Sequence, residues 1–99
     1  QLPSGLDLCV FDFGVNAGTG RAAKYLQQMI GTTPDGGIGP MTLKKLDEYI
    51  KEEGLENTIL DYQQERQSYY QQLSTFDTFG KGWTRRVDET TEIAIEMCG

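Results

Sequence analysis

The side chains that could do chemistry in this chain are carboxylates, amides and two thiols, because its 99 residues include no histidine. Without a histidine base, serine and cysteine lack the usual means of becoming nucleophiles, and two cysteines are too few for a zinc site. Fifteen Asp and Glu are present, but no motif marks a pair of them for general acid and base work. The sequence therefore predicts neither nucleophilic catalysis nor a metal or other cofactor.

Asn16 is the first candidate for ligand binding, because it lies at the predicted end of a helix, just before Gly18. Its amide could donate and accept hydrogen bonds, as recognition of a sugar N-acetyl group requires, or it could cap the helix and hold the turn. Asp12, one turn earlier, is the carboxylate nearest to this corner. If it is buried, it needs a partner such as an arginine.

The second candidate is a glycine-rich loop, Asp35-Gly36-Gly37-Ile38-Gly39-Pro40. Gly31 before it is typical of the left-handed residue that ends a helix, and Pro40 is typical of the first position of the next helix. Ile38 is the one loop side chain apolar enough to anchor the segment. Asp35 could contact a ligand, but we favour a structural role in which it accepts hydrogen bonds from its own turn. The loop lacks the ligand pattern of an EF-hand and the Gly-Lys of a phosphate loop.

Aromatic side chains are the third candidate, because their rings stack on sugar faces as readily as they fill a core. The residues concerned are Tyr25, Tyr69, Tyr70 and Trp83. Adjacent positions of a helix cannot both face inward, so we expect Tyr69 or Tyr70 to lie near the surface.

The periodicity of apolar residues predicts an all-α domain of about five helices, with no strictly alternating stretch that would indicate a strand. In the first helix, Leu6 to Ala17, apolar residues occupy almost every side, which predicts a buried central helix. Thr19 is the expected N-cap of the second helix, and Gly54 is expected to stop the third. The fourth, from Glu56 to Leu73, contains Arg66 in its apolar stripe, where it should pair with an acid.

The last part of the chain is predicted to be a loop followed by a helix. The loop covers residues 74–82, with Phe76 and Phe79 expected to fold inward, and the helix begins at Trp83. Cys9 and Cys98 lie in apolar stripes, so two buried free thiols are expected; a bridge between the two ends is the alternative. The whole chain, residues 1–99, is expected to be one domain with one core.

Three blocks of the sequence together resemble the C-terminal, peptidoglycan-binding half of phage-type endolysins of glycoside hydrolase family 108. The first is Phe11-Asp12-Phe13-Gly14-Val15-Asn16-Ala17-Gly18, similar to the family's central helix. The second is Leu26-Gln27 followed by the glycine loop and Met41-Thr42, and the third is Gly82-Trp83-Thr84-Arg85-Arg86-Val87. They occur in the family's order and span most of the chain.

This resemblance implies a half of a lysozyme-like fold that binds peptidoglycan glycan strands and packs against an upstream catalytic half. The predicted substrate-binding residues are Asn16, Gly18, Asp35, Gly36, Ile38 and Gly39, which lie in the motifs that resemble the family, and Tyr70 and Trp83, whose rings could stack on sugars. The family's catalytic glutamate lies in a Glu-Gly-Gly motif upstream of the central helix, and that motif is absent from the 99 residues. The parent is therefore expected to be a muramidase, whereas this chain lacks the acid.

Two rival interpretations stay open. In one, the segment is an integral wall of a single lysozyme fold and binds nothing alone; in the other, the scaffold serves a structural or secretion-associated interaction. The net charge of −6 disfavours nucleic acid and anionic lipid as partners, since both are polyanions. We expect a monomer, made in the bacterial cytoplasm by a phage or prophage gene and acting at the periplasm or cell wall, and we find no signal peptide or membrane span.

Overall fold

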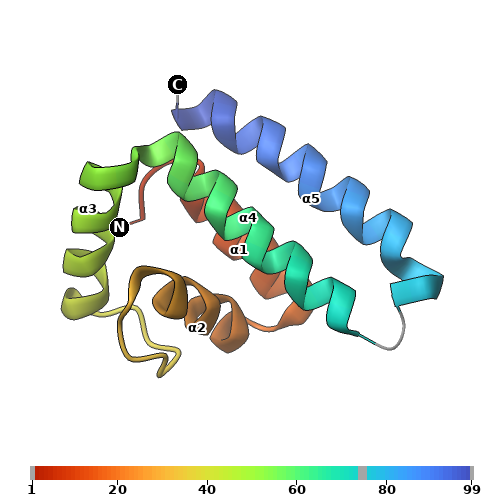
Figure 1. Cartoon of the computed structure of the whole chain (residues 1–99), viewed down its shortest axis with the longest axis horizontal. Coiled ribbons are helices and arrows are strands. Elements are labelled where there is room, and N and C mark those ends of the chain that lie inside the picture. The colour runs from red at the N-terminus through yellow and green to blue at the C-terminus, as the bar shows by residue number, and fades with distance from the viewer. Residues whose placement is uncertain (1, 74–75, 99) are drawn as a thin grey trace.

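Over the residues that the structure describes, the chain forms five helices and no strand, which confirms the predicted all-α class. The computed structural model describes residues 2–73 and 76–98, with side chains of the last segment from residue 80 onward. The helices are α1 (Leu6–Ala17), α2 (Thr19–Ile30), α3 (Pro40–Glu53), α4 (Leu55–Gln72) and α5 (Phe76–Cys98) (Figure 1). The predicted inward folding of Phe76 and Phe79 lies outside the described side chains.

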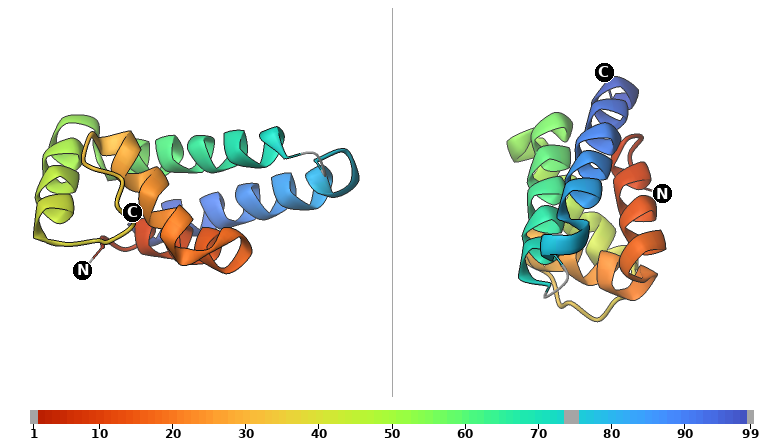
Figure 2. Two further views of the ribbon diagram at one scale, coloured as in Figure 1. Left: turned by 90° about the horizontal axis from the view of Figure 1, so that it is seen from below. Right: turned by 90° about the vertical axis from the view of Figure 1, so that its right-hand side faces the viewer.

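The two longest helices, α4 and α5, run side by side, and α1 packs against both of them (Figures 1 and 2). Helix α2 packs on α1 and α4, while α3 contacts α4 and α2 at one end of the bundle. The resulting domain measures 38 × 30 × 19 Å. The α1–α2 corner lies at the start of α2, and the loop to α3 leaves from the other end of this helix.

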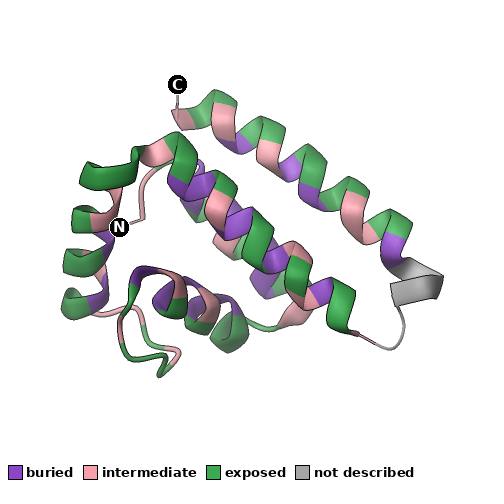
Figure 3. Ribbon diagram, in the orientation of Figure 1, coloured by how far each residue is buried: buried purple, intermediate pink, exposed green. Residues whose placement is uncertain are grey.

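The core is built around the ring of Phe13 on α1. Four tyrosine rings from α2 and α4 lie around it, with ring centroids 5.5–6.2 Å from that of Phe13: Tyr25, Tyr62, Tyr69 and Tyr70. Buried residues face the interior on α1, α2, α4 and α5 (Figure 3). The hydroxyl of Tyr62 also donates to the carbonyl of Ala22 at 2.9 Å, which ties α4 to α2.

Two predicted helix boundaries were wrong. Gly18, rather than Thr19, is the N-cap of α2, because its positive φ of 103° lets the backbone turn directly from α1 into α2. Helix α5 begins at Phe76, so most of the predicted loop is helical. Glycine lowers helix propensity by about 1 kcal/mol per residue, and packing of a long helix along α4 offsets that cost.

Helix α1 is not buried on all sides, contrary to the prediction. Phe11 and Val15 are 70% and 65% exposed, and Leu8 on the same side is half-buried. Ile93 and Met97 of α5 are also exposed, and Met97 borders the same surface depression as Leu8 and Phe11. We call these five residues, three on α1 and two on α5, the α1 outer face. An apolar helix face left uncovered in this way is typical of an interaction surface.

Both cysteines are free thiols. Cys9 is fully buried, and this burial raises its pKa to about 12, although the charge of Arg66 opposes the shift. Cys98 is half-buried rather than buried, and its Sγ donates to the carbonyl of Ile95 at 3.3 Å. Within the described residues, no helix is long and apolar enough to cross a membrane.

Candidate functional site

The corner between α1 and α2 is closed by backbone hydrogen bonds. The N–H of Gly18 donates to the carbonyl of Gly14 at 2.8 Å, and the carbonyl of Gly18 accepts from the N–H of Ala22 at 3.1 Å. Asn16 lies exposed in the last turn of α1, and its amide forms no hydrogen bond with any described residue. The structure therefore gives the capping role to Gly18 and leaves the Asn16 amide available to a ligand.

The glycine loop is organised by Gln27, which the sequence analysis quoted as part of a motif but gave no structural role. This side chain is 1% exposed, and its Nε2 lies within 2.9–3.1 Å of Asp35 Oδ1, the Gly37 carbonyl and Thr42 Oγ1. Its Oε1 accepts from the Gly36 N–H at 2.9 Å. The signal was in the sequence, because Gln27 is a polar residue four positions after Ala23 and three before Ile30, on a buried helix stripe.

Asp35 has the structural role that we favoured. Its Oδ1 accepts from the Gly37 N–H and from Gln27 Nε2, each at 2.9 Å. These hydrogen bonds, the backbone one first, hold the pKa of Asp35 below its usual value. Ile38 is half-buried against the core, as expected for an anchor.

The glycines of the loop differ in what they contribute. Gly36 has a φ of 84°, which favours glycine, whereas Gly39 is extended, with φ −113° and ψ −172°. Gly31 ends α2 in the predicted left-handed conformation, and Pro40 is the first residue of α3. A left-handed turn is therefore required at Gly36 but not at Gly39.

The loop folds back onto the first turns of α2 and so approaches the α1–α2 corner. A methyl group added at Gly36 would lie 3.5 Å from Lys24 Cε and 3.6 Å from the carbonyl oxygen of Gly20. Lys24 and Gly20 are one turn apart on α2, close to Gly18. The glycine loop therefore approaches the first turn of α2 at Gly20, two residues after the Asn16–Gly18 corner.

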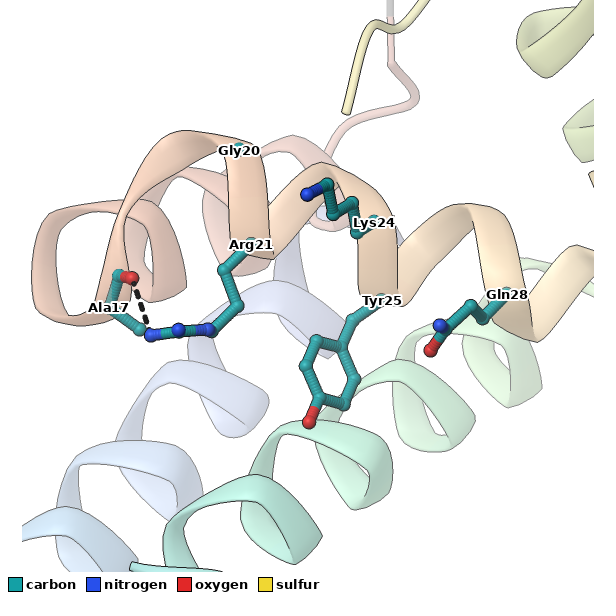
Figure 4. A pocket seen from close by; sticks show the side chains of 6 residues that line it. All are labelled: Ala17, Gly20, Arg21, Lys24, Tyr25 and Gln28. Atoms are coloured by element: carbon teal, nitrogen blue, oxygen red, sulfur yellow. Dashed lines mark hydrogen bonds between the residues drawn. The ribbon is translucent and has the colours of Figure 1, made fainter. Parts of the chain in front are cut away.

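An open hollow of about 390 Å³ lies on this side of α2 (Figure 4). It is lined by Ala17, Gly20, Arg21, Lys24, Tyr25 and Gln28. Arg21 Nη1 donates to the carbonyl of Ala17 at 3.2 Å and to Tyr69 Oη at 2.7 Å. The guanidinium also lies over the Tyr69 ring, 4.9 Å from its centroid. The cation is therefore held in place by neutral groups.

The tyrosine rings behind the hollow support the position of Arg21. Tyr25 and Tyr69 pack edge to face, with centroids 5.7 Å apart. Partial burial and the neighbouring Tyr69 raise the pKa of Tyr25, the charge of Arg21 opposes this shift, and Glu65 adds to it. The Tyr25 hydroxyl therefore stays protonated at neutral pH and cannot neutralise Arg21.

Tyr70 cannot stack on a sugar, which contradicts its predicted place among the binding residues. It is 2% exposed, its hydroxyl accepts from Arg66 Nε at 3.1 Å, and its ring stacks on Trp83 with a centroid distance of 5.1 Å. Tyr69 is the partly exposed member of the pair, as the alternation along the helix requires. Trp83 is half-buried, and Tyr70 covers part of its ring.

Asp12 belongs to a buried ion cluster and not to the hollow. It is 6% exposed and is paired with Arg66 and with Arg86, as predicted for a buried aspartate, and the Thr90 hydroxyl lies 3.4 Å from its Oδ2. Burial by itself raises the pKa of Asp12, but hydrogen bonds from Arg86 and Arg66 and their charges outweigh it, so the pKa is lowered. A carboxylate that stays ionised cannot act as a general acid. The described residues contain no group of side chains suited to a metal ion.

No defined protein family matches the sequence, and no curated protein is similar enough to count as a relative. One solved structure, that of Brucella abortus SagA, is closely similar, with a TM-score of 0.89 and 35% sequence identity. The match covers 98% of this chain and 53% of the SagA chain, so this chain spans about half the length of SagA. The domain described here is thus similar, over nearly its whole length, to an all-helical half of SagA.

Proposed function

We propose that this chain binds peptidoglycan glycan strands as one half of a lysozyme-like muramidase. The observation that carries the proposal is that Gly36 of the glycine loop approaches Gly20, two residues after the Asn16–Gly18 corner, beside an open hollow on α2. Both motifs are those that resemble the endolysin family. The free amide of Asn16 supplies a donor and an acceptor for a sugar N-acetyl group, and Tyr25 supplies a partly exposed ring.

Cleavage by the parent protein would depend on an acid outside this chain. Glycoside hydrolysis requires a carboxylic acid with a raised pKa, and Asp12 has a lowered one. The chain by itself is therefore proposed to hold the substrate rather than to cut it.

Retention on insoluble peptidoglycan tests this function. We expect the domain to be retained and most of that retention to survive high salt, because hydrogen bonds and stacking act at short range. Asn16→Ala should weaken retention about three- to tenfold, the effect of losing one or two hydrogen bonds. Gln64→Ala is the matched control, since it removes another exposed amide, on α4, that makes no hydrogen bond to a described residue. Retention that disappears in high salt, or equal loss in both variants, would contradict the proposal.

The α1 outer face is proposed to pack against the catalytic half of the same protein. Phe11 and Val15 are exposed on a helix whose sequence is apolar on almost every side, and the similar SagA chain is about twice as long as this one. A second domain of that size would cover the face and remove its apolar area from water.

A chimera tests this packing. When the chain is joined to the part of SagA outside the match, the α1 amides should exchange hydrogen more slowly than in the isolated chain. Phe11→Asp should abolish the protection, and Met41→Asp on α3, a similarly exposed apolar residue, should not. If the isolated chain instead forms a dimer that Phe11→Asp disrupts, a second copy covers the face and this part of the proposal is wrong.

A further inference from the structure

We infer that the hollow on α2 binds a carboxylate group, supplied by the peptide stem of peptidoglycan; this inference rests on the proposed function. It starts from Arg21, which is fixed in place but not neutralised. All of its hydrogen bonds to described residues are made by Nη1, to Ala17 O and Tyr69 Oη. Nε and Nη2 have no such partner, and a carboxylate accepts two parallel hydrogen bonds from a guanidinium.

The charge around the hollow is unusual for this protein. The chain has a net charge of −6, yet both ion pairs found among the described residues are made to Asp12, which is buried and does not line the hollow. Arg21 and Lys24 are one turn apart, both exposed, and no carboxylate lines the hollow. Glu65 acts on the pKa of Tyr25 but forms no ion pair with either cation. The hollow is therefore a local cationic site on an acidic surface.

The remaining lining residues favour an amino-acid ligand over a bare anion. Gln28 adds an amide that can pair with a peptide group, and Tyr25 adds an apolar ring edge. A volume of about 390 Å³ is adequate for a small ligand such as an acylated dipeptide. Peptide stems of peptidoglycan combine these features, since they carry free carboxylates on amide-linked residues close to the glycan.

The site is also pre-organised. Stacking on Tyr69 and the hydrogen bond to Ala17 O fix the guanidinium before any ligand arrives, so little side-chain freedom is lost on binding. On the other side, Lys24 lies against the glycine loop at Gly36. A ligand in the hollow would therefore lie beside Ala17 of the α1–α2 corner and beside Lys24, which the loop approaches.

A matched pair of probes tests the inference. N-acetyl-L-alanyl-D-glutamate carries the carboxylates, and its diamide has nearly the same shape without the charge. In a titration followed by amide chemical shifts, the acid should bind with shifts at residues 17–28, and the diamide should bind at least about tenfold more weakly. Arg21→Gln should weaken binding of the acid by about tenfold and leave the diamide unchanged.

Control variants separate this site from general charge effects. Arg85→Gln and Lys44→Gln each remove an exposed cation that makes no ion pair with a described residue, and neither should change binding. Equal affinity for acid and diamide, or equal loss in Arg85→Gln and Arg21→Gln, would overturn the inference. Inorganic phosphate that binds at the same residues as tightly as the acid would overturn it too, since the site would then be an anion site without selectivity for carboxylates.

The retention assay distinguishes failure here from failure of the proposed function. If the inference is right, Arg21→Gln removes the part of peptidoglycan retention that salt weakens, and the remainder becomes independent of salt. If Arg21→Gln is retained exactly as the wild type is, in low and high salt, the domain still binds glycan but the carboxylate site is wrong. If the wild type is not retained at all, the proposed function fails first.

Discussion

Arg66 and Arg21 carry the same guanidinium group in opposite situations. Arg66 is fully buried, 5.6 Å from the ring centroids of Phe13 and Tyr70, and its charge is balanced by Asp12. Arg21 is exposed, lies over Tyr69, and has neutral hydrogen-bond partners. A buried cation must be neutralised within the fold, because desolvation is costly, whereas an exposed one can remain available to a ligand. Arg66 thus contributes to stability, whereas Arg21 is the arginine that we propose binds a ligand.

The largest expected effect is the loss of the buried carboxylate. Asp12→Asn should lower the free energy of unfolding by about 3–5 kcal/mol at neutral pH, because Arg66 would stay buried without a counter-charge. Arg86→Gln should cost about 1 kcal/mol or less, since Arg86 is 56% exposed and solvent screens its pair. Urea unfolding of both variants measures these differences, with Asp88→Asn, an exposed carboxylate, as the control.

The same cluster predicts a pH dependence. The folded-state pKa of Asp12 lies below its unfolded value, so its stabilising contribution is fully present above the unfolded pKa of about 4 and is lost as the pH falls through the folded pKa. The difference in the free energy of unfolding between the wild type and Asp12→Asn should therefore become smaller in acid. A difference that stays constant from neutral pH into strong acid would mean that Asp12 contributes by shape and not by charge.

An intermediate effect is expected where the glycine loop borders the hollow. Gly36→Val should destabilise the fold by about 1–3 kcal/mol, because a β-branched residue is strained at a φ of 84°. Gly39→Val should be nearly neutral, since its backbone is extended and a Cβ there meets no atom within 4 Å. Thermal unfolding of the two variants measures this difference. Equal melting temperatures for Gly36→Val and Gly39→Val would show that the turn at Gly36 is not under conformational constraint.

The smallest expected effect on stability is that of Arg21→Gln, within about 0.5 kcal/mol of the wild type. The side chain is exposed, and the rings of Tyr25 and Tyr69 pack on each other without it. Differential scanning calorimetry is the measurement. A loss of stability approaching that of Asp12→Asn would contradict the contrast between Arg66 and Arg21, because Arg21 would then be required for the fold as well.

Some of the site could be predicted from the sequence because the signals are local. Gly31 and Pro40 mark the ends of helices, and the spacing of apolar residues predicted α2, α3 and α4 to within a residue or two. Arg66 in an apolar stripe indicated an internal ion pair. The structural role of Gln27 was missed, although it too is a polar residue on a buried stripe, because glutamine carries no charge that demands an explanation.

The set of helices, the turns that require glycine or proline, and the need of Asp12 for a cationic partner could all be predicted from the residues. Each depends on interactions within one or two turns of chain or on the cost of burying a charge. Three features follow instead from how the helices pack: Tyr70 is buried while Tyr69 supports Arg21, α1 leaves Phe11 and Val15 exposed, and Gly36 approaches Lys24. These outcomes depend on which helix faces meet, and hydrophobic periodicity gives the faces of a helix without saying which neighbour covers each one.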